Sequence, residues 1–199
     1  MAIILGINKD HSDSSACLLI DGKLIGAVAE ERLGKRLKHD SSFPKNSIKW
    51  LVKESNINYS DINVIAVSNN SLSNLPNKFF HSFDFSRKNL FKKIKSKIFN
   101  KTSIDKEIID LCLSNAEDKN NLKYKIYKVE HHLAHIASAY YLSDFKNRTA
   151  GLSYDGSGDA VSIMLAECNN TEIKVLERVY LPKSLGHFYS AVCNYIGFE

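Results

Sequence analysis

Residues 2–33, AIILGINKDHSDSSACLLIDGKLIGAVAEERL, contain the unit on which the fold is built. Two apolar runs, 2–8 and 16–20, predict buried strands separated by the polar turn KDHSDSS. Asp21-Gly22 then predicts a tight hairpin turn, because glycine tolerates a positive φ. A third strand is expected over 23–33, so the unit is strand, polar loop, strand, tight turn, strand.

The same unit occurs a second time from residue 149. A strand over 149–156 ends in the polar loop DGSGD, a second strand follows, and Asn169-Asn170 turns the chain into a third. Such a three-stranded meander followed by a helix, in duplicate, is the layout of actin, the sugar kinases and the heat-shock-chaperone ATPases. The predicted fold class is therefore α/β, an actin-like ATPase (ribonuclease H-like) duplicated fold.

The part between the two units is divided by composition. A helix is expected from Pro44, with Ile48, Leu51 and Val52 on one face, and strands are expected over 62–70 and 123–130. The intervening segment, about 70–120, is rich in Asn, Ser and Lys and is interpreted as an insertion. Two helices are expected in it, near 86–99 and 103–115.

Two domains follow from this layout. Residues 1–148 form the first actin-like half, with the basic helical insertion, and 149–199 begin the second half. The second half lacks the crossover strands that a parallel sheet needs to cover its faces. We expect it to be truncated and the chain to be the N-terminal part of a longer protein.

Charge and cysteine usage limit the classes of partner. Lys and Arg number 27 against 22 Asp and Glu, and the excess lies largely in 87–101. This is a local patch and not a nucleic-acid-binding stripe. Its helical stripe Leu90, Ile94, Ile98 is expected to cover an edge of its own domain, the alternatives being an acidic partner, an anionic acceptor or a membrane surface. No signal peptide or membrane span is recognisable, so we expect a cytoplasmic protein without a membrane partner. The four cysteines form no CxxC pair, so we expect them to be reduced.

The segment VEHHLAHIASAYY, 129–141, holds three of the seven histidines. At 100° per residue His131 and His135 share one side of a helix, nearly opposite an apolar stripe of Leu133, Ile136, Ala137, Tyr140 and Tyr141. Residues i and i+4 are neighbours, so both imidazoles can reach one metal ion, and the positive end of the helix favours neutral imidazole. The alternative is a pair of solvated histidines on a surface helix.

The loop YDGSGD, 154–159, is the second candidate. Asp155 is expected to end a buried strand, Gly156 and Gly158 to let backbone amides approach an anion, and Asp159 to hold a cation that bridges phosphates. The alternative is a glycine-containing hairpin without a ligand. The earlier loop DHSDSS has the corresponding alternative of an ordinary Asx-rich turn.

Taken together, five segments resemble the O-carbamoyltransferases of the nodulation-factor, cephalosporin and aminoglycoside type, relatives of the universal tRNA threonylcarbamoyl transferases. In chain order they are LGIN..HSDSSACLLIDGKLIGAVAEERL, RLKHDSSFPKNSI, HHLAHIASAYY, YDGSGD and SLGHFYSAVCNYIGF. The resemblance implies an enzyme whose C-terminal domain makes carbamoyl-adenylate from carbamoyl phosphate and ATP. Its N-terminal, actin-like domain transfers the carbamoyl group to an acceptor hydroxyl. The present chain matches part of that N-terminal domain, and we expect it to be inactive alone.

The resemblance also implies site residues. A divalent metal, often taken to be iron, would be held by His131, His135 and Asp155, with a further aspartate beyond Glu199. The nucleotide, ATP or carbamoyl-adenylate, would be lined by the loop residues Asp155, Gly156, Ser157, Gly158 and Asp159.

Two catalytic residues are hypothesised in addition. His11 is a candidate base for the acceptor hydroxyl, because imidazole titrates near neutrality, and Lys38 is a point charge for a phosphate or carbamoyl oxygen. GKRLKHD is one residue longer than the usual form of this segment, so Arg36 or His39 are alternatives to Lys38.

Three further expectations concern packing and partners. Glu30 to Arg32 should form an ion-pair network that braces the third strand. SLGHFYSAVCNYIGF should pack as a helix through Leu185, Phe188, Val192 and Ile196, with His187 structural.

A tRNA-modifying transferase and a nucleotide-binding module without chemistry remain alternative functions. The acceptor hydroxyl is expected on a small molecule or sugar and nucleic acid is not an expected partner, whereas a homodimer is left open.

Overall fold

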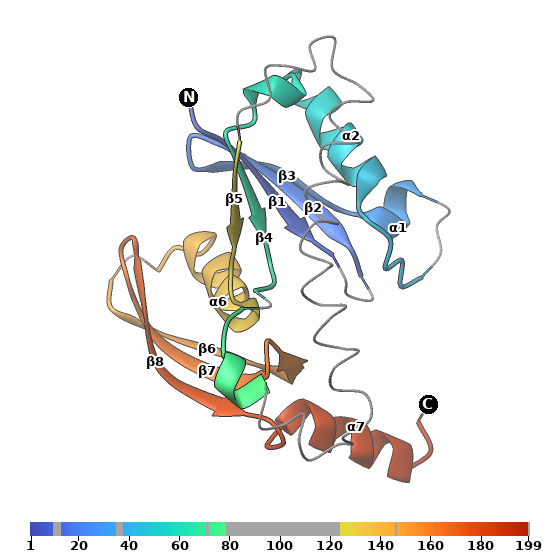
Figure 1. The fold of residues 1–199 in the computed structure, drawn as a ribbon, viewed down its shortest axis with the longest axis vertical. Helices are drawn as coiled ribbons and strands as arrows, with labels where there is room; N and C mark the ends of the chain where they lie inside the picture. Colours follow the sequence, from blue (N-terminus) through green and yellow to red (C-terminus); the bar gives the residue numbers. More distant parts are fainter. Residues whose placement is uncertain (10–12, 35–37, 71, 79–123, 146, 199) are drawn as a thin grey trace. The chain divides into compact units, whose positions relative to one another are not determined.

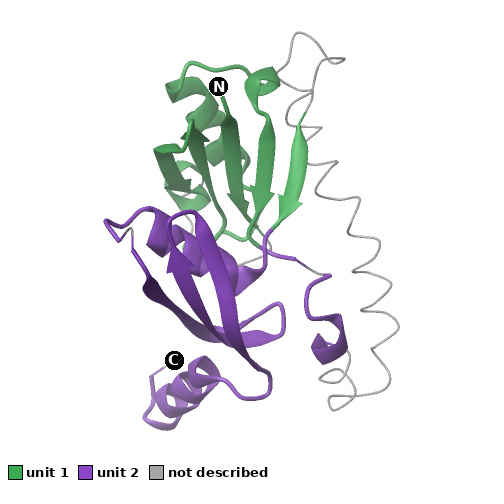
Figure 2. Ribbon diagram, turned by 90° about the vertical axis from the view of Figure 1, so that its left-hand side faces the viewer, with its two compact units in different colours: residues 1–68, 94–128 green, residues 69–93, 129–199 purple. Residues whose placement is uncertain are grey.

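The computed structural model describes residues 1–9, 13–34, 38–70, 72–78, 124–145 and 147–198. The chain divides into two compact units, one of residues 1–68 and 94–128 and one of residues 69–93 and 129–199 (Figure 2). The two helices expected near 86–99 and 103–115, and the basic stripe within them, lie outside the described residues.

Unit 1 is built on a five-stranded sheet in the order β3-β2-β1-β4-β5 (Figure 1). β1, β2 and β3 form the predicted antiparallel meander, and β4 and β5 join it in parallel pairing, β4 beside β1 and β5 beside β4. The strand bounds are β1 Ile3–Asn8, β2 Ser15–Ile20, β3 Lys23–Ala29, β4 Val64–Val67 and β5 Lys125–Lys128.

The core of unit 1 forms between this sheet and α2 (Lys45–Glu54). Alternate residues of β1 are buried, as period 2 requires of a strand with one face inward. The predicted helical face is confirmed, since Ile48, Leu51 and Val52 are all buried in the same cluster. A short 3-10 helix, η1 (Tyr59–Asp61), leads into β4.

The third strand is shorter than predicted. It ends at Ala29, and Glu30–Leu33 forms the short helix α1. The Glu30 carboxylate, 2% exposed, accepts hydrogen bonds from the backbone N–H groups of Asn46 and Ser47 at 3.0 and 2.9 Å, and from both of their side chains at 2.7 Å. The first N–H groups of a helix have no intrahelical partner, and the N-cap residue Pro44 offers no side-chain acceptor. The expected ion-pair network bracing β3 is therefore wrong for Glu30, which caps α2 instead.

Unit 2 contains the second meander. β6 (Thr149–Gly158), β7 (Val161–Asn169) and β8 (Glu172–Tyr180) pair antiparallel in that order, and the predicted turn is present with Asn170 at φ 51°. Each of the two meanders is followed by a helix, so the α/β class and the duplicated, actin-like arrangement are confirmed.

Two helices accompany this second sheet. α6 (His131–Tyr141) packs on it through Ile136 and Tyr140, in a cluster with Val161, Met164, Ala166 and Cys168. Part of the predicted stripe is wrong, because Tyr141 is 48% exposed while His132 is fully buried in its place.

α7 (Leu185–Tyr195) differs from its prediction as well. It has no buried residue, and Leu185, Phe188, Val192 and Ile196 are all more than a third exposed, so the expected packing of this stripe is absent from the described structure. Its first turn does touch β6. None of the described helices is long and apolar enough to cross a membrane.

A candidate metal centre between α6 and β6

Two histidines and one aspartate converge at the first turn of α6. His131 Nε2 lies 2.8 Å from Asp155 Oδ2, and His135 Nε2 lies 3.0 Å from His131 Nε2 and 3.6 Å from the same carboxylate oxygen. The i, i+4 spacing brings the rings to the same side of the helix, as predicted, and β6 supplies the carboxylate. Both elements belong to unit 2, so one compact body builds the whole cluster.

The cluster is closed on one side and open on the other. The side chains of His131, Asp155 and His135 are 16%, 31% and 54% exposed, respectively. The alternative of two solvated histidines therefore fails for His131, whose ring is directed at Asp155. His135 forms the open side, from which a ligand can enter.

The donor set fits a divalent transition metal. Imidazole nitrogen is a borderline ligand that suits zinc and iron, and two His with one carboxylate is a recurring non-haem iron set. Ligand atoms about 2.1 Å from one ion at angles of 90° to 110° lie about 3.0 to 3.4 Å apart. The observed separations of 2.8, 3.0 and 3.6 Å bracket that range, and the three ligand atoms lie within 4.8 Å of one another.

Asp155 lies within β6 and not at its end, which corrects the prediction. Pairing with β7 is regular to Tyr154–Ile163 and resumes only at Gly158–Val161. The carboxylate thus sits where the ladder is interrupted, an irregularity of the kind that redirects a side chain next to functional sites.

The ionised form of Asp155 is strongly favoured. Burial alone would raise the pKa of Asp155, but its interactions with the three neighbouring histidines, first of all the hydrogen bond with His131, outweigh burial and hold the pKa of this carboxyl well below its usual range. For His132, burial alone would lower the pKa, but the Asp155 carboxylate outweighs burial and the pKa is raised. An ionised aspartate beside imidazoles is the state that a metal ion requires.

Asp159 holds the start of α6. Its carboxylate, 7% exposed, accepts hydrogen bonds from the backbone N–H of His131 at 3.0 Å and of Asn70 at 2.9 Å, and pairs with Lys78 Nζ at 2.9 Å. A negative group at a helix N-terminus stabilises it. The predicted role of Asp159 in holding a cation stays a prediction; in the structure its oxygens already serve α6 and Lys78.

Glu130 anchors the same turn from the other side. Arg178 of β8 donates two hydrogen bonds to its carboxylate, at 2.9 and 2.8 Å, and Asn74 Nδ2 donates a third at 2.9 Å. Burial alone would raise the pKa of Glu130, but these donors outweigh burial and lower it. Sequence reasoning missed Asn70, Asn74, Lys78 and Arg178, and no local pattern identifies them.

The glycines of YDGSGD make room for protein groups. A Cβ atom on Gly158 would overlap the His131 ring, and one on Gly186 of α7 would overlap the backbone of Asp155 and Gly156. Ser184, the N-cap of α7, also donates to the Gly156 carbonyl at 2.6 Å. Ser157, between Gly156 and Gly158, is exposed. Close packing accounts for Gly158, whereas the predicted approach of backbone amides to an anion is not tested.

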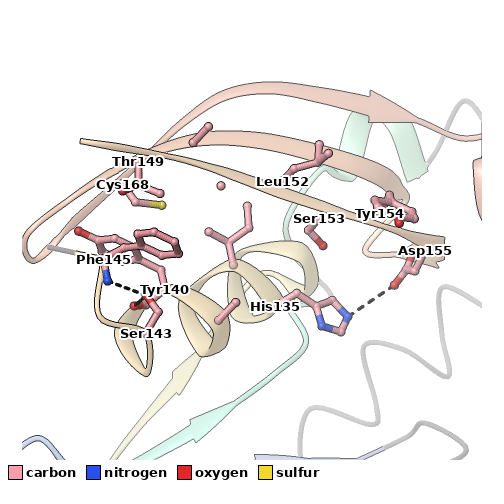
Figure 3. Close-up of a pocket in the computed structure, with 14 residues that line it drawn as sticks. His135, Tyr140, Ser143, Phe145, Thr149, Leu152, Ser153, Tyr154, Asp155 and Cys168 are labelled. Atoms are coloured by element: carbon pink, nitrogen blue, oxygen red, sulfur yellow. Dashed lines mark hydrogen bonds and ion pairs between the residues drawn. The ribbon is translucent and has the colours of Figure 1, made fainter. Parts of the chain in front are cut away.

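A pocket of about 420 Å³ extends from the cluster along the groove between α6 and β6 (Figure 3). His135 and Asp155 line it at one end, and apolar and hydroxyl-bearing groups line the rest, among them Ile136, Tyr140, Ser143, Phe145, Leu152 and Cys168. The cluster is therefore reached from a cavity of the size that holds small molecules.

The candidate catalytic residues outside the cluster belong to unit 1. His11 and the alternative Arg36 lie outside the described residues. Lys38 is exposed, in a turn, and next to it His39, at φ 63°, pairs through Nδ1 with Asp13 Oδ1 at 2.9 Å. The roles of His11 and Lys38 stay predictions.

Comparison with known proteins identifies relatives over nearly the whole chain. Residues 3–199 match the family described as carbamoyltransferase N-terminus. The nodulation protein NolNO of Sinorhizobium fredii is 30% identical over 192 residues, which cover 96% of this chain and 26% of NolNO. The protein sll1178 of Synechocystis sp. is 30% identical over 206 residues, which cover 100% of this chain and 32% of that protein. The chain thus spans about a quarter to a third of the length of these curated relatives.

Among solved structures, YeaZ from Pseudomonas aeruginosa superposes with a TM-score of 0.48 at 14% identity, covering 92% of this chain and 68% of YeaZ.

Proposed function

The chain belongs to the carbamoyltransferase N-terminus family, and from this membership we propose that it carries the transfer step of an O-carbamoyltransferase. The donor is carbamoyl-adenylate, made from carbamoyl phosphate and ATP in another part of the full-length enzyme, and the acceptor is a hydroxyl of a small molecule or sugar. The observation that carries the proposal is the convergence of His131, His135 and Asp155, two of which, His135 and Asp155, line one end of a pocket.

The reaction exchanges one C–O bond for another. The acceptor oxygen attacks the carbamoyl carbon, the bond from that carbon to the adenylate phosphate oxygen breaks, and AMP leaves with its electron pair. The proton of the acceptor hydroxyl goes to a base, for which His11 is our candidate. Lys38 is the candidate positive group for a phosphate or carbamoyl oxygen.

His131, His135 and Asp155 would hold the metal ion. When bound, a divalent metal supplies Lewis-acid polarisation of the carbamoyl oxygen and neutralises charge on the leaving phosphate. The two imidazoles and the carboxylate bring one negative charge to the site. Asp159 and Glu130 keep the two histidines in place, because they fix the first turn of α6 to the rest of unit 2.

The nucleotide would be bound by the backbone of Gly156 to Gly158 and by the exposed Ser157. The support for this assignment is the actin-like fold class and the position of the loop, which starts next to Asp155 on β6. Asp159 contributes indirectly in our proposal, since its carboxylate is engaged with Lys78 and with the start of α6.

The test uses the full-length enzyme with His131→Ala and His135→Ala, and with His187→Ala as the control, an exposed histidine of α7 outside the cluster. Elemental analysis should show that metal content falls to near zero in the first two variants and is unchanged in the control, with the far-UV circular dichroism unaltered in all three. Acceptor-dependent consumption of carbamoyl-adenylate should be lost together with the metal. Undiminished metal content in both cluster variants would overturn the assignment, and modified tRNA as the product would replace the proposed acceptor.

A further inference from the structure

His132, the middle one of the three histidines of α6, is buried completely, unlike His131 and His135. Its ring uses both nitrogens: Nδ1 lies 2.8 Å from Ser153 Oγ, and Nε2 lies 2.9 Å from the carbonyl oxygen of Val161. A carbonyl can only accept, so Nε2 carries the proton that it donates. The ring therefore ties α6 to β6 through Ser153 and to β7 through Val161.

Ser153 and Asp155 lie two residues apart on β6 and share the face of the strand that is turned toward α6 (Figure 3). The exposed Leu152 and Tyr154 alternate with them. A contact that holds Ser153 against α6 consequently also sets how far Asp155 lies from the imidazoles of that helix.

His132 also contacts the Asp155 carboxylate directly, through the second carboxylate oxygen. Oδ2 faces His131 and His135, whereas Oδ1 is buried and has no hydrogen-bond partner among the described residues. The group opposite Oδ1 is the Nε2–H of His132, at 3.4 Å. A buried oxygen of a charged carboxylate is costly unless a positive or donating group lies near it. An Nε2–H held in place by Val161 meets that need from one direction only, and so favours one orientation of the carboxylate.

We propose that His132 is a positioning residue for the metal centre, which orients the Asp155 carboxylate so that Oδ2 is presented to the same ion as His131 and His135. It binds no metal itself, because its two nitrogens are engaged with Ser153 and Val161. This inference rests on the proposed metal site and adds to it a residue outside the ligand set. Groups that hydrogen-bond to ligating carboxylates and histidines commonly change metal affinity by about 10- to 100-fold.

The test compares two amide substitutions in the full-length protein. In His132→Gln the side-chain amide nitrogen lies near the position of Nε2, so a donor toward Val161 and Asp155 is kept. In His132→Asn the amide is one bond shorter and lies near the position of Nδ1, so that donor is lost. His187→Gln is the control on α7. The affinity for Co²⁺ is measured by titration, and its visible spectrum reports the ligand geometry.

We expect His132→Asn to lower Co²⁺ affinity about 10- to 100-fold and to alter the spectrum, with His132→Gln restoring most of the affinity. Thermal unfolding in the presence of a chelator is measured in parallel. A residue that only supports the fold would lower the unfolding temperature equally in both variants while the remaining folded protein kept its affinity and spectrum, and that result would overturn the proposal.

The failure of the metal site itself is distinguishable. If wild-type protein binds no Co²⁺, Zn²⁺ or Fe²⁺, the proposed metal centre is overturned. Metal-free crystal structures then still decide the inference about His132: an Asp155 carboxylate that keeps its orientation in His132→Asn contradicts it, and one that rotates away from His131 supports it.

Discussion

The imidazole of His131 occupies the space in which a side chain on residue 158 would begin, so that a Cβ atom built on Gly158 overlaps the ring. The second glycine of the DGSGD loop thus lets a strand end pass directly beneath one of the two candidate metal-binding histidines. A sequence pattern typical of phosphate loops here also serves the packing of the histidine.

Gly158→Ala should destabilise the protein by about 1–3 kcal/mol, because the new methyl group must displace the His131 ring from a packed position. Gly156→Ala is the matched control in the same loop, since its Cβ would lie 3.5 Å from His187, an ordinary contact. We expect a change within about 0.5 kcal/mol for that variant. Urea unfolding measures both, and equal effects in the two variants would contradict this account of the loop.

Glu30→Ala should cost about 2–4 kcal/mol, because it leaves four donors at the start of α2 without their acceptor. Glu54→Ala, at the exposed last position of the same helix, is the control. A negative charge near a helix C-terminus is unfavourable, so its removal should leave stability unchanged or slightly raised. The free energy of unfolding in urea is the measurement; the capping role fails if Glu30→Ala is as stable as the control.

Arg178→Gln should lower stability by about 1–2 kcal/mol, since it leaves the carboxylate of Glu130, whose side chain is 10% exposed, without its two charged hydrogen bonds. The control is Arg148→Gln, which breaks a single hydrogen bond of 2.7 Å to Glu167 made by an arginine that is 77% exposed. Ion pairs of that kind contribute little to stability. Differential scanning calorimetry should therefore show a lower melting temperature for Arg178→Gln alone, and a comparable loss for Arg148→Gln would contradict the importance of burial.

The thiols of Cys17 and Cys168 should react slowly with iodoacetamide. Burial raises the pKa of both above that of an ordinary cysteine, which disfavours the reactive thiolate. At neutral pH the thiolate fraction of these two cysteines is therefore smaller than usual. Their labelling rate should still rise with pH at values where the labelling rate of a free thiol has already reached its plateau. Peptide mapping by mass spectrometry at several pH values measures this.

The control for the labelling is the same protein in urea, in which both cysteines should react at the rate of a free thiol. A native-state rate that levels off at the pH typical of free thiols would show that the two sites are more open than the structure indicates.

The sequence alone sufficed for the features that depend on local spacing. The two meanders follow from apolar runs and turn residues a few positions apart, and both are present with their helices. The His131–His135 pair follows from the helical repeat, because i and i+4 must lie on one side of a helix. The apolar face of α2 was predicted for the same reason.

The tertiary structure decided which groups complete these local features. Glu30 was expected to brace a strand and instead caps α2. The groups that donate to its carboxylate, on Asn46 and Ser47, lie 16 and 17 positions away in the sequence, so no local pattern shows them. His132 is a histidine like His131 and His135, yet it alone of the three is buried, because the sheet covers its side of α6. Lys78 meets Asp159 across 81 positions of chain. Periodicity specifies the direction of a side chain relative to its own helix or strand, whereas the identity of its partner depends on how elements pack, and only the folded chain fixes that.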